Sequence, residues 1–248
     1  MGVRRLGAAA LFGTKAFSQS ATRDFSPRKI LLYIYEIGLR TLPLVLMVGF
    51  FTGMVLGLQG YYTLVDFGSE SLIGSLVALT VVREIGPVLT AIMVVGQAGS
   101  AMSAEIGVQR NTEQIDALQV MGIPPLSFLV GPRIIAAVLC FPLLTAFFNT
   151  IAIWGGYVSS VAILGVDGGV YLANVRVGIA WNDLLDSHLK AAIFGLLTVT
   201  VCCFAGYFTH EFANLRGARG VSQSATRAVV ISSVLILFSD YLITSFVL

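Results

Sequence analysis

The sequence predicts an all-α integral membrane protein with about five transmembrane helices, an N-terminal interfacial helix and one short polar helix on the cytoplasmic side. Of its 248 residues, 56% are hydrophobic and only 11% are charged, whereas an ordinary soluble domain carries about 25% charged residues. A water-soluble fold of this size could not hide so much apolar surface. The alternation of about ten-residue strands that marks a membrane β-barrel is absent from the sequence.

Long runs without charge supply the transmembrane segments. Ile85–Ala104 has no charged residue over twenty positions, and Ile134–Val166 has none over 33. A bilayer core about 30 Å thick needs roughly 20 helical residues. The expected spans are Thr41–Tyr61, Ser71–Ala104, Pro132–Leu164, Leu189–Thr209 and Ala228–Leu248. Residues 41–248 therefore form one transmembrane domain, preceded by a separate segment at 1–40.

That first segment is predicted to contain an interfacial helix. In RKILLYIYEIGLR, residues 28–40, the charged residues Lys29, Glu36 and Arg40 fall on one helical stripe, with Ile, Leu and Tyr elsewhere. A basic amphipathic helix of this kind lies flat at the headgroup boundary. The alternative is a cytoplasmic extension of the first span.

Two stripes of small residues predict close helix packing, because small side chains let helix backbones approach in lipid. They are Gly49, Gly53 and Gly57 in the first span, and the pairs Gly96/Ser100 and Gly99/Ser103 in the second. Gln59 lies about 200° around the helix from Gly57, so it is expected to face away from the glycine contact.

The second span should be distorted at Pro87. Proline has no N–H, so the carbonyl of Arg83 loses its usual partner four residues on, and the helix is expected to kink or break. Arg83 and Glu84 are adjacent, about 100° apart on a helix, and cannot simply pair with each other. Counting back from Glu105, Arg83 lies about 33 Å along a helix, near the outer edge of the bilayer.

Residues 106–125, IGVQRNTEQIDALQVMGIPP, are the longest strongly polar stretch in the middle of the chain. Asn111 is a candidate N-cap, Gln114 can complete a capping box, and Gly122 before two prolines is a stop signal. The prediction is a helix at Thr112–Met121, roughly 15 Å long.

The predicted short helix has two faces: Ile115, Leu118 and Gly122 on one, and mostly Glu113, Asp116 and Gln119 on the other. A stiff, capped helix between two spans has the form of a coupling helix, which docks in a groove of a soluble ATPase. An ordinary ordered cytoplasmic loop is the alternative.

The basic residues predict the orientation. Segments 1–40, 105–133 and 210–227 hold twelve of the fifteen Lys and Arg residues. These are Arg4, Arg5, Lys15, Arg23, Arg28, Lys29, Arg40, Arg110, Arg133, Arg216, Arg219 and Arg227. The positive-inside rule then places the N-terminus in the cytoplasm and the C-terminus outside. Arg83, Arg176 and Lys190 fall on or near the other side.

Known catalytic signatures are missing from the sequence. There is no G-x-x-x-x-G-K-[ST] phosphate loop and no G-x-S-x-G nucleophile elbow. Neither H-E-x-x-H nor a pair of neighbouring histidines is present, so no metal site is expected. Cys140, Cys202 and Cys203 lie in apolar spans and are expected to be small buried hydrophobes. The chain is therefore predicted to be non-catalytic and to hold no cofactor of its own.

Four stretches of the sequence resemble the MlaE/YrbE permease family, the membrane subunits of MCE-associated ABC transporters of phospholipids. They are FTGMVLGLQGY (51–61), REIGPVLTAIMVVGQAGSAMSAEIG (83–107), TEQIDALQVMGIPP (112–125) and PLLTAFFNTIAIWGG (142–156). The resemblance covers roughly residues 28–248. One departure is Gln97, which stands where the family's GRAGSA motif has a basic residue.

The resemblance implies a homodimer in the bacterial inner membrane that moves phospholipids between the inner and outer membranes and so maintains outer-membrane lipid asymmetry. It further implies two ATPase subunits that bind ATP, a ring of MCE proteins on the periplasmic side, a small STAS-domain protein, and no nucleic acid. The implied lipid cavity is lined by the first two segments and the last.

The site residues expected under this resemblance form two groups. Arg83 could bind a lipid phosphate bidentately, with Glu84 orienting it and Gln59 near the same level; side chains snorkelling at a helix end are the alternative. Glu113, Asp116, Leu118 and Gly122 are expected to contact the ATPase.

Two other classes of function stay open from the sequence. One is an ion-coupled secondary transporter, for which Asp240 is the candidate acid within a span. The other is a non-transporting membrane scaffold, in which the glycine stripes would serve packing alone.

Overall fold

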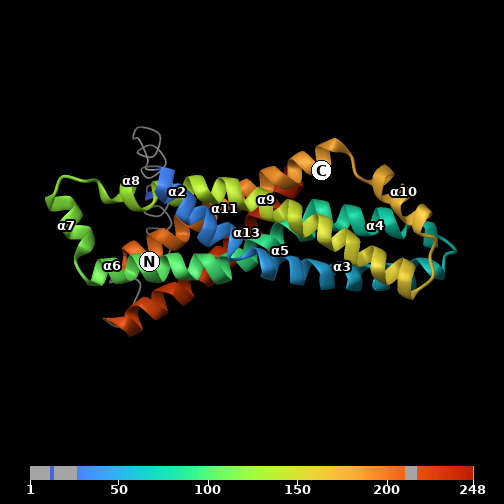
Figure 1. The fold of residues 1–248 in the computed structure, drawn as a ribbon, viewed down its shortest axis with the longest axis horizontal. Helices are drawn as coiled ribbons and strands as arrows, with labels where there is room; N and C mark the ends of the chain where they lie inside the picture. The colour runs from blue at the N-terminus through green and yellow to red at the C-terminus, as the bar shows by residue number, and fades with distance from the viewer. Residues whose placement is uncertain (1–11, 14–26, 210–216, 248) are drawn as a thin grey trace. The chain divides into compact units, whose positions relative to one another are not determined.

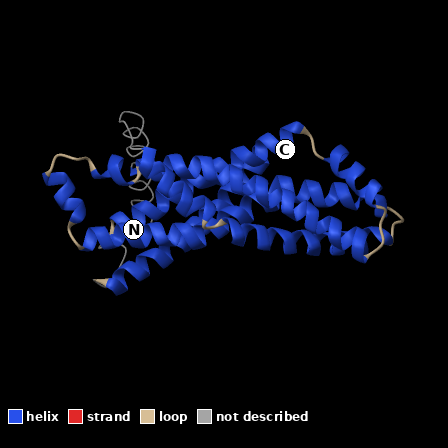
Figure 2. Ribbon diagram, in the orientation of Figure 1, coloured by secondary structure: helices blue, strands red, loops and turns tan. Residues whose placement is uncertain are grey.

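The computed structural model describes residues 12–13, 27–209 and 217–247, and every regular element in these ranges is helical (Figure 2). Five helical stretches are long and apolar enough to cross a membrane: Pro27–Val65, Glu70–Asn111, Pro125–Ile163, Trp181–Tyr207 and Ala218–Phe246. The predicted fold class and number of spans are confirmed. Arg4, Arg5, Lys15, Arg23 and Arg216 of the predicted basic segments lie outside the described residues.

The helices follow one another with short connections (Figure 1). In the first half of the chain they are α2 (Pro27–Ile34), the π-helical turn η1 (Tyr35–Leu39), α3 (Leu42–Val65), the 3₁₀ turn η2 (Glu70–Leu72), α4 (Ile73–Thr80), the π-helical η3 (Val81–Ile85), α5 (Gly86–Val94), the π-helical η4 (Val95–Gly99) and α6 (Ser100–Asn111). They continue with α7 (Gln114–Val120), α8 (Pro125–Leu129), α9 (Gly131–Tyr157), the π-helical η5 (Val158–Ile163), α10 (Gly168–Gly178), α11 (Trp181–Tyr207) and α13 (Ala218–Val247).

Internal contacts divide the chain into two compact units. Unit 1 comprises residues 1–41, 91–140 and 192–248, as far as they are described, and unit 2 comprises Leu42–Thr90 and Phe141–Ala191. The first four apolar stretches each run from one unit into the other, whereas α13 belongs wholly to unit 1.

In unit 2, α3 packs on α9 through the predicted glycine stripe. A Cβ on Gly53 would overlap the carbonyl oxygen of Ala152, and one on Gly49 would lie 2.8 Å from Ile151. A Cβ on Gly57 would overlap the Ser159 hydroxyl. The three glycines therefore lie where α9 and η5 approach α3 most closely, the geometry that their predicted packing role requires.

A second contact in unit 2 joins α10 to α4, which Figure 1 shows side by side. Tyr171 is fully buried there, and its hydroxyl donates to the carbonyl of Ile153 at 3.1 Å. Burial raises the pKa of the Tyr171 phenol, so it stays a neutral donor at physiological pH. A Cβ on Gly74 would overlap the Tyr171 carbonyl.

In unit 1, α6 packs against α13 and α11. A Cβ on Gly99 would lie 3.0 Å from the Sγ of Cys202, so this glycine is at a close helix contact. Gly96 is exposed and nothing in the described residues lies within 4 Å of a Cβ there, so its packing role stays a prediction. All three cysteines are free and buried, as predicted.

Helices α2 and η1 occupy the segment predicted to be interfacial. Tyr33 and Ile37 are buried, while four apolar side chains on the other side are more than half exposed: Leu31, Leu32, Tyr35 and Leu39. A turn at Arg40–Thr41 separates this segment from α3. Its position at the membrane surface stays a prediction.

Helices α11 and α13 begin at Trp181 and Ala218, several residues before the predicted span starts at Leu189 and Ala228. Hydropathy identifies only the apolar part of a helix, whereas a helix can continue into polar sequence when its end groups find hydrogen-bond partners. At the start of α11, the Asp183 carboxylate accepts a hydrogen bond from the Ala180 amide. Asp183 also belongs to the candidate site.

Candidate functional site

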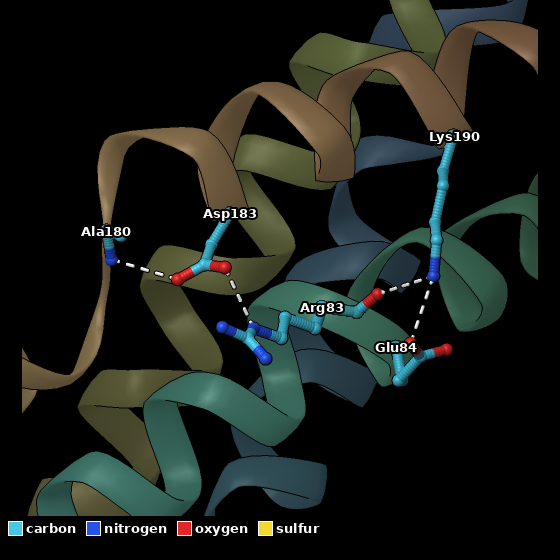
Figure 3. Close-up of polar contacts among 5 residues, drawn as sticks. All are labelled: Arg83, Glu84, Ala180, Asp183 and Lys190. Atoms are coloured by element: carbon cyan, nitrogen blue, oxygen red, sulfur yellow. Dashed lines mark hydrogen bonds and ion pairs between the residues drawn. The ribbon is translucent and has the colours of Figure 1, made fainter. Parts of the chain in front are cut away.

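Four charged side chains meet in unit 2, contributed by η3 and the first turns of α11 (Figure 3). Arg83 Nε donates to Asp183 Oδ1 at 2.8 Å. Lys190 Nζ donates to Glu84 Oε1 at 3.0 Å. The neighbouring positions 83 and 84 therefore bind two residues of α11 that lie seven residues, about two turns, apart. As predicted, Arg83 and Glu84 do not pair with each other.

The distortion predicted at Pro87 takes a milder form than a break. The chain stays helical through the π-turn η3, in which the Gly86 amide donates to the Val81 carbonyl. The carbonyl of Arg83, which Pro87 deprives of its usual donor, accepts a hydrogen bond from Lys190 Nζ at 2.9 Å. The lysine thus replaces the missing amide, so the helix has no need to break.

The cluster combines a buried lysine with an accessible arginine. Lys190 is only 3% exposed, whereas the Arg83 side chain is 45% exposed. Among the described residues, the terminal nitrogens of Arg83 have no hydrogen-bond acceptor, because the bond to Asp183 uses Nε. A guanidinium fixed through Nε and open at both Nη atoms suits an oxyanion such as a phosphate.

Asp183 holds the arginine in place. Its second oxygen, Oδ2, accepts a hydrogen bond from the Ala180 amide at 2.9 Å, at the start of α11. A carboxylate at a helix N-terminus is stabilised by the helix dipole. Asp183 therefore fixes the guanidinium with one oxygen while the other anchors it to its own helix.

Asp183 and Lys190 were not predicted as site residues. From the sequence, Lys190 stands only as an exception to the charge bias, and the fourth span is predicted to begin just before it, at Leu189. A lysine at the edge of a charge-free run is a signal for a site, since ionisable residues within a span are costly and usually paired. Asp183 lies seven residues before Lys190, about two helical turns, so the two charged side chains are on the same face of the helix. This spacing was a second signal for a site.

A neutral polar contact lies within the same unit. Asn149 Nδ2 on α9 is 3.3 Å from Ser187 Oγ on α11, and a Cβ on Gly86 would overlap the Asn149 amide oxygen. Ser187 lies one turn before Lys190. Asn149 and Gly86 therefore help to hold α11 against the distorted part of the second span.

The third residue predicted for this site, Gln59, lies on the exposed side of α3, away from the Gly57 contact as expected. On α3 itself, an apolar groove of about 490 Å³ is lined by Met47, Val48, Phe51, Thr52, Val55 and Leu56. The only polar side chain in this lining is a threonine, so the groove suits hydrocarbon.

The polar interruption in unit 1 forms a short helix, but its start was predicted wrongly. Asn111 is the last residue of α6 instead of an N-cap, and α7 begins at Gln114. Glu113 precedes it in the left-handed conformation with φ +59°, and no side chain caps the helix. The stop is as predicted, with Gly122 at φ +72°.

Side-chain contacts join α7 to its neighbours, and α6, α7 and α8 form one projecting loop (Figure 1). Asp116 Oδ1 is 2.7 Å from Arg110 Nη1 on α6, and Gln119 Nε2 donates to the Tyr207 hydroxyl of α11 at 3.3 Å. Ile115 is fully buried. Asp116, predicted to contact an ATPase, already has an internal partner.

The most exposed large apolar side chains near α7 are at its end. Val120 is 89% exposed and Met121 is 64% exposed, and neither was singled out in the sequence. Glu113 is exposed, whereas Leu118 is half-buried. The exposed surface of this loop therefore combines polar side chains such as Gln114 with an apolar tip, Val120 and Met121, which the Gly122 turn follows.

Gln97, the departure from the family motif, has a defined partner. Its Nε2 donates at 3.1 Å to the carbonyl of Arg40, in the turn that separates η1 from α3. A neutral amide thus satisfies a carbonyl that the turn leaves without a helical donor.

Comparisons with known proteins agree on one family. The family model "Permease MlaE" matches residues 30–246. The intermembrane phospholipid transport system permease protein MlaE of Haemophilus influenzae is 39% identical over 213 residues, which cover 86% of this chain and 80% of that protein. A probable ABC transporter permease of Rickettsia conorii is 38% identical, over 96% of this chain and 90% of its own length.

A more distant relative is a probable ABC transporter permease of Synechocystis, 32% identical over 97% of this chain and 90% of that protein. The matches extend over both units and all five apolar stretches. With a helical membrane domain, a distorted second span carrying the Arg83–Glu84 pair and a short helix after α6, the chain belongs to the MlaE permease family.

Proposed function

We propose that the chain is the permease subunit of an ABC transporter that moves phospholipids between two membranes. Family membership supports the assignment, since the Haemophilus relative is named for intermembrane phospholipid transport. The single structural observation that carries it is the Arg83 guanidinium, held through Nε by Asp183 and open at its terminal nitrogens. A membrane domain has few other reasons to keep an arginine half-exposed within a helical stretch.

The two features of unit 2 match the two parts of a phospholipid. Arg83 offers paired N–H donors for the phosphate. The groove on α3 offers an apolar surface for an acyl chain. Snorkelling at a helix end does not explain Arg83, because the helix runs on from Arg83 to Glu70 for about 20 Å.

The energy source is assigned to a separate ATPase subunit. Relatives named as ABC transporter permeases support this assignment. The sequence contains no phosphate loop of its own, and α7 offers a braced, projecting loop with an apolar tip for docking. Gly122 follows that tip, and Glu113 lies at the other end of α7.

The assembly proposed follows the family. The chain would work as a homodimer in the inner membrane, with an ATPase bound on the cytoplasmic side, a ring of MCE proteins on the other side, and a small STAS-domain protein attached to the ATPase. The charge bias supports the orientation, with α7 in the cytoplasm.

The test is to purify the chain with its ATPase partner and to measure two quantities, the phospholipid that co-purifies and the ATP-dependent transfer of labelled phospholipid to acceptor vesicles. We expect Arg83→Gln to lower both about tenfold or more, since a charge-assisted hydrogen bond contributes roughly 1.5–3 kcal/mol. The matched control is Arg176→Gln, which removes an exposed arginine from α10. Normal lipid content and transfer in Arg83→Gln would refute the assignment.

An ion-coupled transporter is the second candidate, since Glu84 paired with the buried Lys190 adds an acid within a span to Asp240. The same vesicles separate the two functions. Transfer that needs ATP and continues in the presence of ionophores supports the ABC permease. Transfer that stops when an ion gradient is collapsed, with or without ATP, supports ion coupling.

A further inference from the structure

Arg133 is the largest side chain that is fully buried among the described residues. It lies in the first turn of α9, in unit 1, remote in sequence from the Arg83 cluster. The sequence counts it only among the basic residues that predict the orientation, and the proposed lipid site does not use it. A charged group with 0% exposure is costly and must be held by specific partners, so its contacts are informative.

One guanidinium contacts three other helices. Arg133 Nη2 is 2.7 Å from Glu105 Oε2 on α6, and Nη1 donates to the Leu129 carbonyl at the end of α8, at 2.9 Å. The guanidinium carbon lies 4.5 Å from the centre of the Tyr33 ring on α2. Only Arg has the planar fork that can meet a carboxylate, a carbonyl and an aromatic face together.

The helices that it joins are the two stems of the α7 loop and the N-terminal helix. Helix α6 leads into α7, and α8 follows it. A second cation contact supports the same junction, since Lys29 Nζ on α2 lies 3.1 Å from the centre of the Phe128 ring on α8. Any displacement of α7 must therefore move groups that Arg133 holds against α2.

Packing alone would not require a charge at this position. A buried ion pair can often be replaced by apolar residues of similar volume without loss of stability. The guanidinium adds directional contacts that fix the positions of α6, α8 and α2 relative to one another, which apolar contacts do not do.

We propose that Arg133 is the positioning residue that transmits movement of the α7 loop to α2, and through the Arg40–Thr41 turn to the first span. The proposal rests on the proposed function, in which an ATPase moves α7. Glu105 and Tyr33 act with Arg133, while the Lys29–Phe128 contact keeps α2 on α8.

The test uses the complex of the full chain with its ATPase and measures ATP hydrolysed per phospholipid transferred. Arg133→Met keeps most of the side-chain volume but removes the fork. We expect the complex to assemble and to hydrolyse ATP, with the ratio of ATP to lipid raised roughly two- to thirtyfold, the usual range for a change in coupling. Arg133→Lys, which keeps the charge and a donor, should restore part of the coupling.

Glu105→Gln is the second variant, because it keeps the shape of a side chain that is already 45% exposed and so carries less risk to folding. It should raise the same ratio, whereas the control Arg176→Met should not. A well-assembled Arg133→Met complex with the wild-type ratio of ATP to lipid overturns the proposal. If Arg133→Met fails to assemble, Glu105→Gln decides in its place, and a wild-type ratio in that variant overturns the proposal. A wild-type complex that transfers no lipid instead contradicts the proposed function.

Discussion

Gly53 has no room for a side chain. A Cβ there would overlap the Ala152 carbonyl, and Gly155 on α9 is in the same position relative to the Phe50 carbonyl of α3. The two helices are therefore in backbone contact from both sides. In lipid, where no hydrophobic effect drives helices together, such close packing is what holds a pair.

Gly53→Ala should therefore destabilise the protein by about 1–3 kcal/mol or more, the usual cost of overpacking. The expected result is a lower thermal midpoint for the protein in detergent, followed by fluorescence or size-exclusion after heating. Gly96→Ala is the matched control, because an added Cβ meets nothing within 4 Å. Equal midpoints for the two variants would contradict the packing assignment.

The two glycine positions show what residue patterns can predict. Four-residue spacing places Gly49, Gly53 and Gly57 on one helix face, and all three lie against α9 or η5. It could not say whether Gly96 has a neighbour, since that depends on which helix lies opposite. For the same reason Arg83 and Glu84 were found from the sequence, whereas their partners on α11, a hundred residues further along the chain, were not.

Among the elements, α7 differs most from its prediction at the N-terminal end. The capping signal at Asn111 was plausible, but Asn111 stays in α6 and its Nδ2 donates to the Gly217 carbonyl. The hydroxyl of Thr112 accompanies it by donating to the Val108 carbonyl. One tertiary and one local contact thus accompany the extension of α6 to Asn111, where the next helix was predicted to start. The glycine stop at 122 needs no partner and was predicted correctly.

The π-helical turns were not predicted either. Pro87 predicted that the Arg83 carbonyl would lose its helical hydrogen bond. Whether the helix then breaks or forms a π-helical turn depends on which group donates to that carbonyl. Here that group is the Lys190 ammonium, which no local pattern around Pro87 could reveal.

The surface of α7 predicts how an ATPase docks. Changing both Val120 and Met121 to Ser should reduce co-purification of the ATPase about tenfold or more, because buried apolar side chains at an interface contribute roughly 1.5–3 kcal/mol each. Membrane insertion should not change. Pull-down from detergent extracts, normalised to the amount of inserted chain, measures the effect.

Val177→Ser provides the comparison, since Val177 is 85% exposed but lies on α10. Changing both Glu113 and Asp116 to Lys should act differently, because a positive charge at position 116 would repel Arg110 and loosen α7 itself. If the serine variant binds the ATPase normally and only the lysine variant fails, docking is electrostatic and the apolar tip has no part in it.

At the scale of the whole molecule, the predicted orientation in the membrane rests on charge alone. The number of spans could be predicted from the sequence because it depends only on the length and hydropathy of the apolar stretches. The direction of insertion depends on basic residues in short loops near the ends of the helices. Several of these have additional structural roles, since Lys29, Arg110 and Arg133 all make contacts within unit 1.

This orientation can be tested with single cysteines. Val120→Cys and Val177→Cys place a thiol at positions that are 89% and 85% exposed. Because the two residues lie in loops divided by one span, α9 with η5, they must face opposite sides of the membrane. In right-side-out vesicles, a membrane-impermeant maleimide should label Val177→Cys at once and Val120→Cys only after permeabilisation.

The native cysteines make the experiment clean, because Cys140, Cys202 and Cys203 are buried and burial protects a thiol from alkylation. The unchanged chain should therefore take up almost no label before or after permeabilisation. Labelling of Val120→Cys in intact vesicles, with Val177→Cys protected, would reverse the orientation and place α7 where no cytoplasmic ATPase can reach it. The proposed coupling through α7 and Arg133 would then fail together with the orientation, whatever the lipid content of the purified chain.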